Sequence, residues 1–241
     1  MRYAIFSDVH SNLEAFKAVL EFFSKSNIDR YLFIGDIVGY GADPKECIAA
    51  LLRLNAISVA GNHDRAAVGL MDIDYFNETA REAILWTKDN LSGPDSLFLS
   101  GLELVKEEGN CCLVHGTLAR PQEFDYMIDG YRAMKSFYVL KQQICFVGHS
   151  HHPGVFIEEG KKIDYLESKI LKIEKGKRYI VNDGSVGQPR DGDPRACCCI
   201  YDNESSILEF KRLDYDITCA QKKMMSAGLP MSLAERLSKG R

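Results

Sequence analysis

The sequence lacks the features that define several common protein classes. No two of its 8 cysteines have the C-x-x-C spacing of zinc or redox sites. No apolar run is long enough to cross a membrane, and the first strand-like segment reaches polar residues already at Ser7, which argues against a signal peptide. We therefore expect a cytoplasmic protein with no membrane association, whose thiols are reduced and mostly buried.

The sequence also has no excess of positive charge. Lysine and arginine number 30 against 34 aspartates and glutamates, so the net charge is -4. A broad nucleic-acid-binding surface needs a concentrated positive face to neutralise phosphates, and we expect none here. The hydrophobic content of 46% supports a sizeable core, and no repeat, low-complexity stretch or linker divides the chain. Residues 1–241 are therefore predicted to form one domain.

Three apolar segments near the N-terminus each end in a polar cluster. They are residues 3–6, 31–34 and 56–60, and apolar residues at helical spacing lie between them at 13–23 and from Pro44 onward. This pattern predicts a parallel βαβαβ unit whose strands end at one edge, where open α/β sheets bind ligands. A further helix over 77–91, capped by Asn77 and stopped by Gly93-Pro94, would belong to a helical insert at about 65–100.

The second half of the chain is richer in strand-like segments. Residues 111–114, 144–147 and 179–181 are apolar and end in polar clusters, and residues 196–201 and 207–210 are typical of a hairpin. The tail from Tyr215 to Leu237 has helical spacing and is broken near Gly228-Leu229-Pro230. The exposed faces of the insert and of this tail could support a homo-oligomer.

All six histidines lie in the polar clusters that follow these apolar segments. They are His10, His63, His115, His149, His151 and His152. Histidines that fill a core or face solvent would be scattered along the chain, so this concentration favours one shared site. Any one of them taken alone, such as His115, is more often structural.

The neighbours of these histidines are oxygen ligands. Asp8 and His10 would point the same way in an extended segment, and Asp36 could bridge two cations or cap the following helix from its loop. Asn62 offers a neutral oxygen or a turn, while Asp64 either orients His63 or begins a helix. These residues exceed the needs of one tetrahedral ion and include no thiolate. We therefore expect two divalent transition-metal ions, manganese before iron, zinc, nickel or cobalt.

Five motifs occur in a fixed order along the chain. They are FSDVHSN from Phe6, GDIVGYGADP from Gly35, AGNHD from Ala60, VHG from Val114 and GHSHHP from Gly148. This set resembles the calcineurin-like metallophosphoesterases and is most similar to their small prokaryotic YfcE-like phosphodiesterase branch. The resemblance implies an α/β fold with a four-layer α/β/β/α sandwich, in which two β-sheets are flanked by helices.

The resemblance also implies how the ligands divide between the ions. Three residues would hold the first metal and three the second, with Asp36 bridging: Asp8, His10 and His151 for the first, and Asn62, His115 and His149 for the second. In an extended GHSHHP segment His149 and His151 share one side and His152 faces away, so we expect His152 to be dispensable for metal. Asp183 departs from the family's Asn-Pro-Gly-Ser pattern, which affects the expected geometry of that loop but not the ligands.

The implied activity is hydrolysis of phosphodiesters, nucleotides or dinucleoside polyphosphates by attack of a metal-bound hydroxide. We expect His63, oriented by Asp64, to protonate the leaving oxygen or to stabilise phosphoryl charge. Arg190 would clamp the phosphate, or be a solvated loop residue. Tyr40 would stack on an aromatic leaving group, or pack in its loop. Two alternatives stay open: a phosphoprotein phosphatase with the same metal site, and a non-catalytic binding scaffold.

Overall fold

The computed structural model describes residues 1–241, and its strands form two six-stranded sheets. The first sheet has the order β3 (Ile57–Ser58), β2 (Arg30–Phe33), β1 (Arg2–Phe6), β11 (Ala196–Asp202), β12 (Ile207–Leu213) and β9 (Ile170–Lys172). The second has the order β4 (Val105–Glu108), β5 (Cys111–Val114), β6 (Ile144–Val147), β10 (Arg178–Asn182), β7 (Gly154–Glu159) and β8 (Lys162–Leu166).

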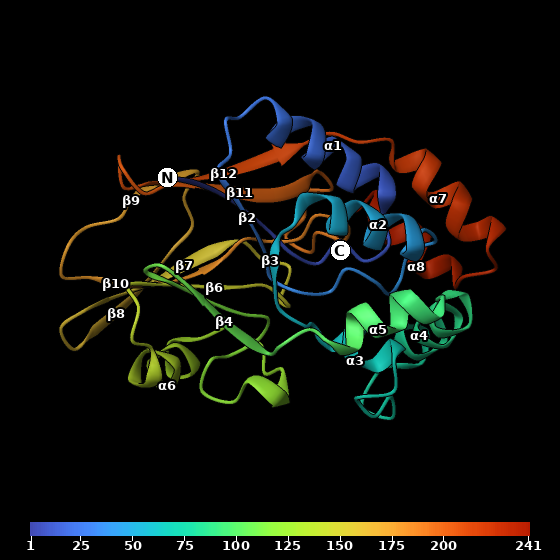
Figure 1. The fold of residues 1–241 in the computed structure, drawn as a ribbon, viewed down its shortest axis with the longest axis horizontal. Coiled ribbons are helices and arrows are strands. Elements are labelled where there is room, and N and C mark those ends of the chain that lie inside the picture. Colours follow the sequence, from blue (N-terminus) through green and yellow to red (C-terminus); the bar gives the residue numbers. More distant parts are fainter.

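The two sheets pack face to face between outer layers of helices (Figure 1). Ile5 and Leu32 of the first sheet share a buried core with Phe146 and Val181 of the second. Helices α1 (Leu13–Ser24) and α2 (Pro44–Leu54) cover the other face of the first sheet, and α6 (Gly130–Val139) covers that of the second. The predicted four-layer sandwich is confirmed. Each helix buries one apolar stripe, because its apolar residues recur at helical spacing.

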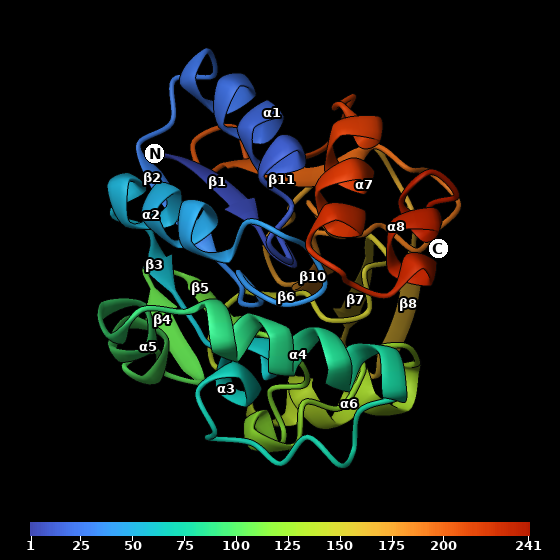
Figure 2. The same cartoon turned by 90° about the vertical axis from the view of Figure 1, so that its right-hand side faces the viewer.

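The remaining helices lie at one end of the sandwich (Figure 2). The insert consists of α3 (Asn62–Ala67), α4 (Glu78–Asn90) and α5 (Gly93–Ser100), and the tail forms α7 (Ile217–Ser226) and α8 (Met231–Leu237). As predicted, the Asn77 side chain caps α4 by accepting a hydrogen bond from the Ala80 amide. None of the helices combines the length and apolar character needed to span a membrane.

Helix α4 ends at Asn90, before the Gly93-Pro94 pair, as predicted, but this pair does more than stop a helix. The pair begins α5, because the Ser92 hydroxyl accepts a hydrogen bond from the Asp95 amide while the Asp95 carboxylate accepts one from the Ser92 amide. Pro94 fits this first turn, where helix amide groups have no helical partner. A proline after a helix is therefore as compatible with a new helix start as with a loop.

The parallel strands of both sheets end at the same edge of the sandwich. β1 pairs in parallel with β2, and β2 with β3, as the βαβαβ pattern predicts. In the second sheet β6 pairs in parallel with both β5 and β10. The polar clusters that follow these parallel strands therefore converge on one place.

All eight cysteines are free, as expected, and only Cys219 is not buried.

Candidate metal centre

Backbone hydrogen bonds fasten the loops of this edge to one another. The amide of Asp8 donates to the carbonyl of Gly35, and the amide of His10 donates to that of Asp36. The Gly148 amide donates to the His115 carbonyl in the same way across the second sheet. The side chains carried by these loops are consequently held by strand ends rather than by free loop segments, which suits a preorganised site.

Several residues of this edge have left-handed backbone conformations. Asp8, His10, Asp36, His149 and His151 all have φ between 48° and 67°. The expected extended geometry of the Asp8–His10 and His149–His151 pairs is therefore wrong. Non-glycine residues adopt this region at a cost, and such strain is concentrated at functional sites. The side chains still converge because the turns, rather than strand alternation, direct them inward.

Each of the two central aspartates has one oxygen bound by the protein and one free. Asp8 Oδ2 accepts hydrogen bonds from the Ser7 hydroxyl at 2.5 Å and from the His149 amide at 3.0 Å. Asp36 Oδ1 accepts one from the His63 amide at 2.9 Å. The other oxygens, Asp8 Oδ1 and Asp36 Oδ2, are buried without a hydrogen-bond partner. The fixed oxygen orients each carboxylate so that the free one faces the histidines.

Three histidines are oriented by backbone carbonyls. Nδ1 of His10 lies 3.1 Å from the Val38 carbonyl, Nδ1 of His115 lies 2.7 Å from that of Ile34, and Nδ1 of His151 lies 2.5 Å from that of Gln188. Because a carbonyl can only accept, each Nδ1 carries a proton, and each Nε2 is the ring atom left to face a cation. This is how proteins fix the tautomer of metal-binding histidines.

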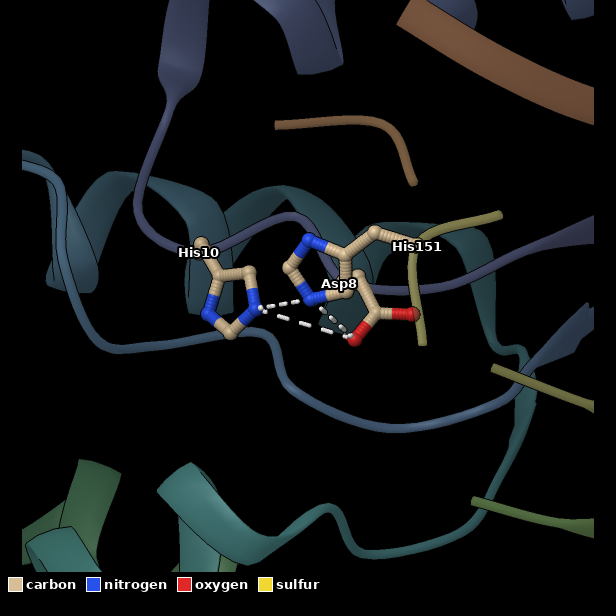
Figure 3. A group of neighbouring side chains, drawn as sticks. All are labelled: Asp8, His10 and His151. Carbon is tan, nitrogen blue, oxygen red and sulfur yellow. Dashed lines mark hydrogen bonds and ion pairs between the residues drawn. The ribbon is translucent and has the colours of Figure 1, made fainter. Parts of the chain in front are cut away.

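Asp8, His10 and His151 form the first group with the geometry of a cation site (Figure 3). Asp8 Oδ1 lies 3.6 Å from His10 Nε2 and 3.2 Å from His151 Nε2, and the two Nε2 atoms are 3.1 Å apart. Two imidazole lone pairs directed at each other repel unless a proton or a cation lies between them. The group therefore fits a divalent ion, and it contains the three residues predicted for the first metal.

Asp36, His115 and His149 form a second such group. His115 Nε2 lies 3.2 Å from Asp36 Oδ2 and has no hydrogen-bond partner of its own. Asn62 Oδ1 is likewise buried and unpartnered, and Asn62 lines the same cavity as Asp36 and His149. Asp36 also lies near the first group, since its Oδ2 is 3.7 Å from His10 Nε2. The structure thus brings together all seven residues predicted as ligands.

The electrostatics of the site depend on the balance between buried acids and imidazoles. Burial disfavours ionisation of Asp8, yet the neighbouring His151 and His115 hold its pKa well below the ordinary value. Burial disfavours a charged His115, but Asp36 and Asp8 outweigh it and raise the His115 pKa to about 10. Burial lowers the pKa of His149 and of His151 to about 3. Two ionised carboxylates so deeply buried require compensating positive charge, which bound cations would supply.

His63 lies beside both groups and lacks a carbonyl partner. It forms a third potential cation group with His10 and Asp36, and its ring packs 4.8 Å from that of His10. Its Nδ1 is buried without a hydrogen bond, and burial holds its pKa well below the ordinary value. Its tautomer is therefore not fixed by the protein, in contrast to His10, His115 and His151.

Asp64 does not orient His63, contrary to the prediction. Its Oδ2 accepts hydrogen bonds from the amides of Asp36 and Gly61, and its Oδ1 accepts from those of Ile37 and Val38. Residue 64 is the third residue of α3, so its side chain turns back toward the start of the helix instead of toward its neighbour. Asp64 consequently fastens the loop that carries Asp36.

Tyr40 and Arg190 both line a cavity of about 200 Å³ beside the metal ligands. The Tyr40 ring is packed 4.4 Å from His63 and 4.7 Å from His10, and its hydroxyl accepts a long hydrogen bond from Arg190 at 3.4 Å. Arg190 Nη2 also donates to Gln188 Oε1 at 2.9 Å, but its guanidinium pairs with no carboxylate. An unpaired guanidinium at a cavity wall is suited to an anionic ligand.

Three further polar residues, His152, Ser7 and Asp183, lie at the same edge. His152 is exposed, in contrast to the other five histidines, which are buried. Ser7, which the sequence did not single out, holds Asp8, and the buried Asp183 has its Oδ1 at 3.0 Å from the Ser7 hydroxyl. The predicted departure at Asp183 therefore lies directly behind the first group, although it contributes no ligand.

The chain matches a known protein family over most of its length. The model of the calcineurin-like phosphoesterase superfamily domain matches residues 1–206. The chain belongs to this superfamily. The superfamily is metal-dependent, in agreement with the two groups of inward-facing aspartate and histidine residues. The resemblance inferred from the five motifs is confirmed at the level of the family.

Individual relatives cover the whole chain. An uncharacterized protein of Methanocaldococcus jannaschii, MJ0912, is 41% identical over 99% of this chain and 98% of its own length. The crystal structure of a metallophosphoesterase from Sphaerobacter thermophilus superposes with a TM-score of 0.87 at 38% identity, covering 100% of this chain and 99% of that one. The Pyrococcus horikoshii OT3 protein PH1004, 18% identical, covers 100% and 98% with a TM-score of 0.80 and supports the fold alone.

Proposed function

We propose that this phosphoesterase-family protein is a dinuclear metal-dependent hydrolase of small phosphate esters. The observation that carries the proposal is the set of buried ligand atoms without partners: Asp8 Oδ1, Asp36 Oδ2, Asn62 Oδ1 and His115 Nε2. Unpaired buried polar atoms are destabilising unless something binds them. Two divalent cations, with manganese as the preferred metal, would bind these atoms. We further propose that residues 1–241 act as one domain in the cytoplasm.

The ligand residues divide between the cations as the two groups suggest. Asp8, His10 and His151 would hold one ion, and Asn62, His115 and His149 the other, with Asp36 contributing to both. Bound cations would supply Lewis-acid activation of water and neutralise phosphoryl charge. The three carbonyl-oriented histidines aim their Nε2 atoms at these positions, and His115 would lose its second proton when an ion binds, so the protein needs little rearrangement to accept the ions.

His63 is the proposed catalytic residue outside the ligand set. It lines the cavity but has no carbonyl to fix its tautomer, so its ring can donate an N–H to the phosphoryl or leaving oxygen. Asp64 acts indirectly, as a positioning residue for the Asp36 loop. Arg190 would bind a phosphate oxygen, with Tyr40 supporting its guanidinium. Substrates would be phosphodiesters, nucleotides or dinucleoside polyphosphates, in each case with the phosphoryl group at the cations.

The assay that tests the proposal uses the manganese-loaded protein on three substrates. They are bis-p-nitrophenyl phosphate, p-nitrophenyl phosphate and diadenosine tetraphosphate. His63→Ala should lose about 10²- to 10⁴-fold in turnover, the usual contribution of a positioned proton donor, and keep its metal. His152→Ala is the matched control, because His152 is exposed and should leave both quantities unchanged.

Two results would favour the alternatives. If the protein binds two ions per chain but hydrolyses none of the three substrates, and cleaves a phosphoserine peptide instead, the phosphoprotein phosphatase reading is correct. If it cleaves no ester at all, the fold serves as a binding scaffold. A His63→Ala variant as active as the parent would remove His63 from the catalytic machinery while leaving the metal site in place.

A further inference from the structure

The cavity beside the metal ligands is lined by two chemically different kinds of residue. Asp36, His63 and Arg190 carry the proposed metal and phosphate contacts. The rest of its wall is largely aromatic and apolar, with Met71, Tyr75, Phe76, Phe124 and Tyr126 among the lining residues. A site built in this way is complementary to a ligand with an anionic end and a flat apolar end.

Tyr126 is held flat against a proposed metal ligand. Its ring stacks on that of His149, with centroids 4.1 Å apart and planes 10° apart, and 44% of the residue is exposed. One face of the Tyr126 ring is therefore covered by His149, while the residue borders the cavity. A ring fixed in this way loses little conformational entropy when a ligand stacks on it.

The loop that carries Tyr126 is folded back over the strand end by Gly116. A Cβ at position 116 would lie 2.9 Å from the Asp125 carbonyl oxygen and 3.0 Å from Phe124 Cα. The absence of a side chain there lets residues 124–126 approach the loop that follows β5. The Phe124 ring also lines the cavity, and its centroid lies 6.0 Å from that of His115. The placement of Tyr126 is thus built into the fold.

Tyr75 reaches the same cavity from the helical insert. It lies in the segment between α3 and α4, next to Phe76, whose ring packs edge-on 5.1 Å from His63. Phe76 anchors this segment to the site, while Tyr75 itself is 86% exposed. An aromatic side chain so exposed at a cavity rim has most of its ring available to a ligand.

We propose that Tyr75 and Tyr126 form an aromatic clamp that determines the substrate class. The clamp would hold a planar ring attached to the phosphate ester, as in a nucleotide, and would favour such esters over phosphates of purely aliphatic alcohols. This inference rests on the proposed function, because it places the phosphoryl group beside the metal ligands. The cavity of about 200 Å³ accommodates one phosphoryl group and the start of one ring-bearing substituent, so the second half of a dinucleoside polyphosphate would extend outside it.

The test compares two ligands that differ only in the base. They are the phosphonate analogue of adenosine 5′-monophosphate, in which a methylene replaces the bridging ester oxygen, and the same phosphonate of ribose without adenine. Neither can be hydrolysed at that position. Their dissociation constants for the manganese-loaded protein, measured by calorimetry, give a binding ratio. We expect adenine to tighten binding by about 5- to 150-fold, the range given by stacking of one base on an aromatic side chain.

Variants assign this ratio to the two rings. Tyr75→Leu and Tyr126→Leu should each bring the ratio down toward one, and Tyr126→Phe should retain it because the ring remains. Tyr138→Leu is the matched control, since Tyr138 is 90% exposed on α6 and does not line the cavity. Metal content is measured for every variant, and Tyr75→Leu tests the clamp even if removing the Tyr126 ring disturbs His149.

The outcomes separate the clamp from the esterase activity. A ratio near one in the parent, or a ratio that survives in either leucine variant with normal metal content, overturns the clamp. Hydrolysis of bis-p-nitrophenyl phosphate, p-nitrophenyl phosphate and diadenosine tetraphosphate is measured on the same preparations. A high binding ratio without hydrolysis would contradict the proposed function and support the clamp. Hydrolysis with a ratio near one would support the proposed function and contradict the clamp.

Discussion

Replacing Asp64 by asparagine should destabilise the protein rather than only slow it. The carboxylate of Asp64 accepts four backbone hydrogen bonds, two on each oxygen. An asparagine can accept on one oxygen only, and its NH₂ group would face two amide donors. Two lost hydrogen bonds to a charged group, at about 1.5–3 kcal/mol each, predict a loss of about 3–6 kcal/mol. Typical domains have a total stability of about 5–15 kcal/mol, so this loss is large.

Urea unfolding of the metal-free protein at pH 8 measures this effect. Burial and the neighbouring Asp36 raise the pKa of Asp64 to about 6, so the parent carboxylate is ionised at that pH. The control is Asp89→Asn, an exposed position on α4 that should change stability by less than about 0.5 kcal/mol. If Asp64→Asn unfolds at the parent's urea concentration yet loses turnover, Asp64 acts on His63 and the positioning role is refuted.

Three further predictions concern metal loading and pH. His152→Ala should keep two metal ions per chain by mass spectrometry, while His151→Ala should lose one; equal loss in both would contradict the division of the GHSHHP histidines. Gly148→Ala should weaken manganese affinity in a metal titration, because a Cβ there would lie 2.6 Å from Asp8 Oδ2; an unchanged affinity would mean that the loop yields without cost. Burial raises the pKa of Tyr215 to about 12. The protonated Tyr215 hydroxyl therefore contributes at most about 2–3 kcal/mol to the free energy of unfolding. This contribution is present below pH 10 and is lost as the pH rises toward 12. Between pH 9 and 11 the melting temperature of Tyr215→Phe should fall less steeply with pH than that of the parent. Equal slopes would refute a stability contribution from the Tyr215 hydroxyl.

The first half of the fold was readable from the sequence because each strand there is a short apolar run followed by a polar cluster. β1 and β2 and the helices α1 and α2 lie where the pattern predicts. The strands β7 (Gly154–Glu159) and β8 (Lys162–Leu166) were missed, because their outer residues are exposed and carry charge, so no apolar run marks them. Helix α6 was missed for a related reason: only one stripe of it is buried, among exposed tyrosines and methionine.

The candidate site was predictable in its membership but not in its geometry. The seven candidate ligand residues could be listed from the motifs because acidic, amide and imidazole groups recur at strand ends. The direction of the Asp64 side chain could not, since a residue next to His63 in sequence turns away from it on a helix. Tyr75 and Tyr126 carried no signal at all, because their proximity to His149 and to the cavity depends on two loops that meet only in the folded chain.

Anomalous diffraction from a crystal of the manganese-loaded protein tests the central claim most directly. We expect two manganese peaks, one among Asp8, His10 and His151, and one among Asn62, His115 and His149, with Asp36 between them. A single peak, or a peak bound through His152 or Asp183 in place of these ligands, would contradict the dinuclear centre.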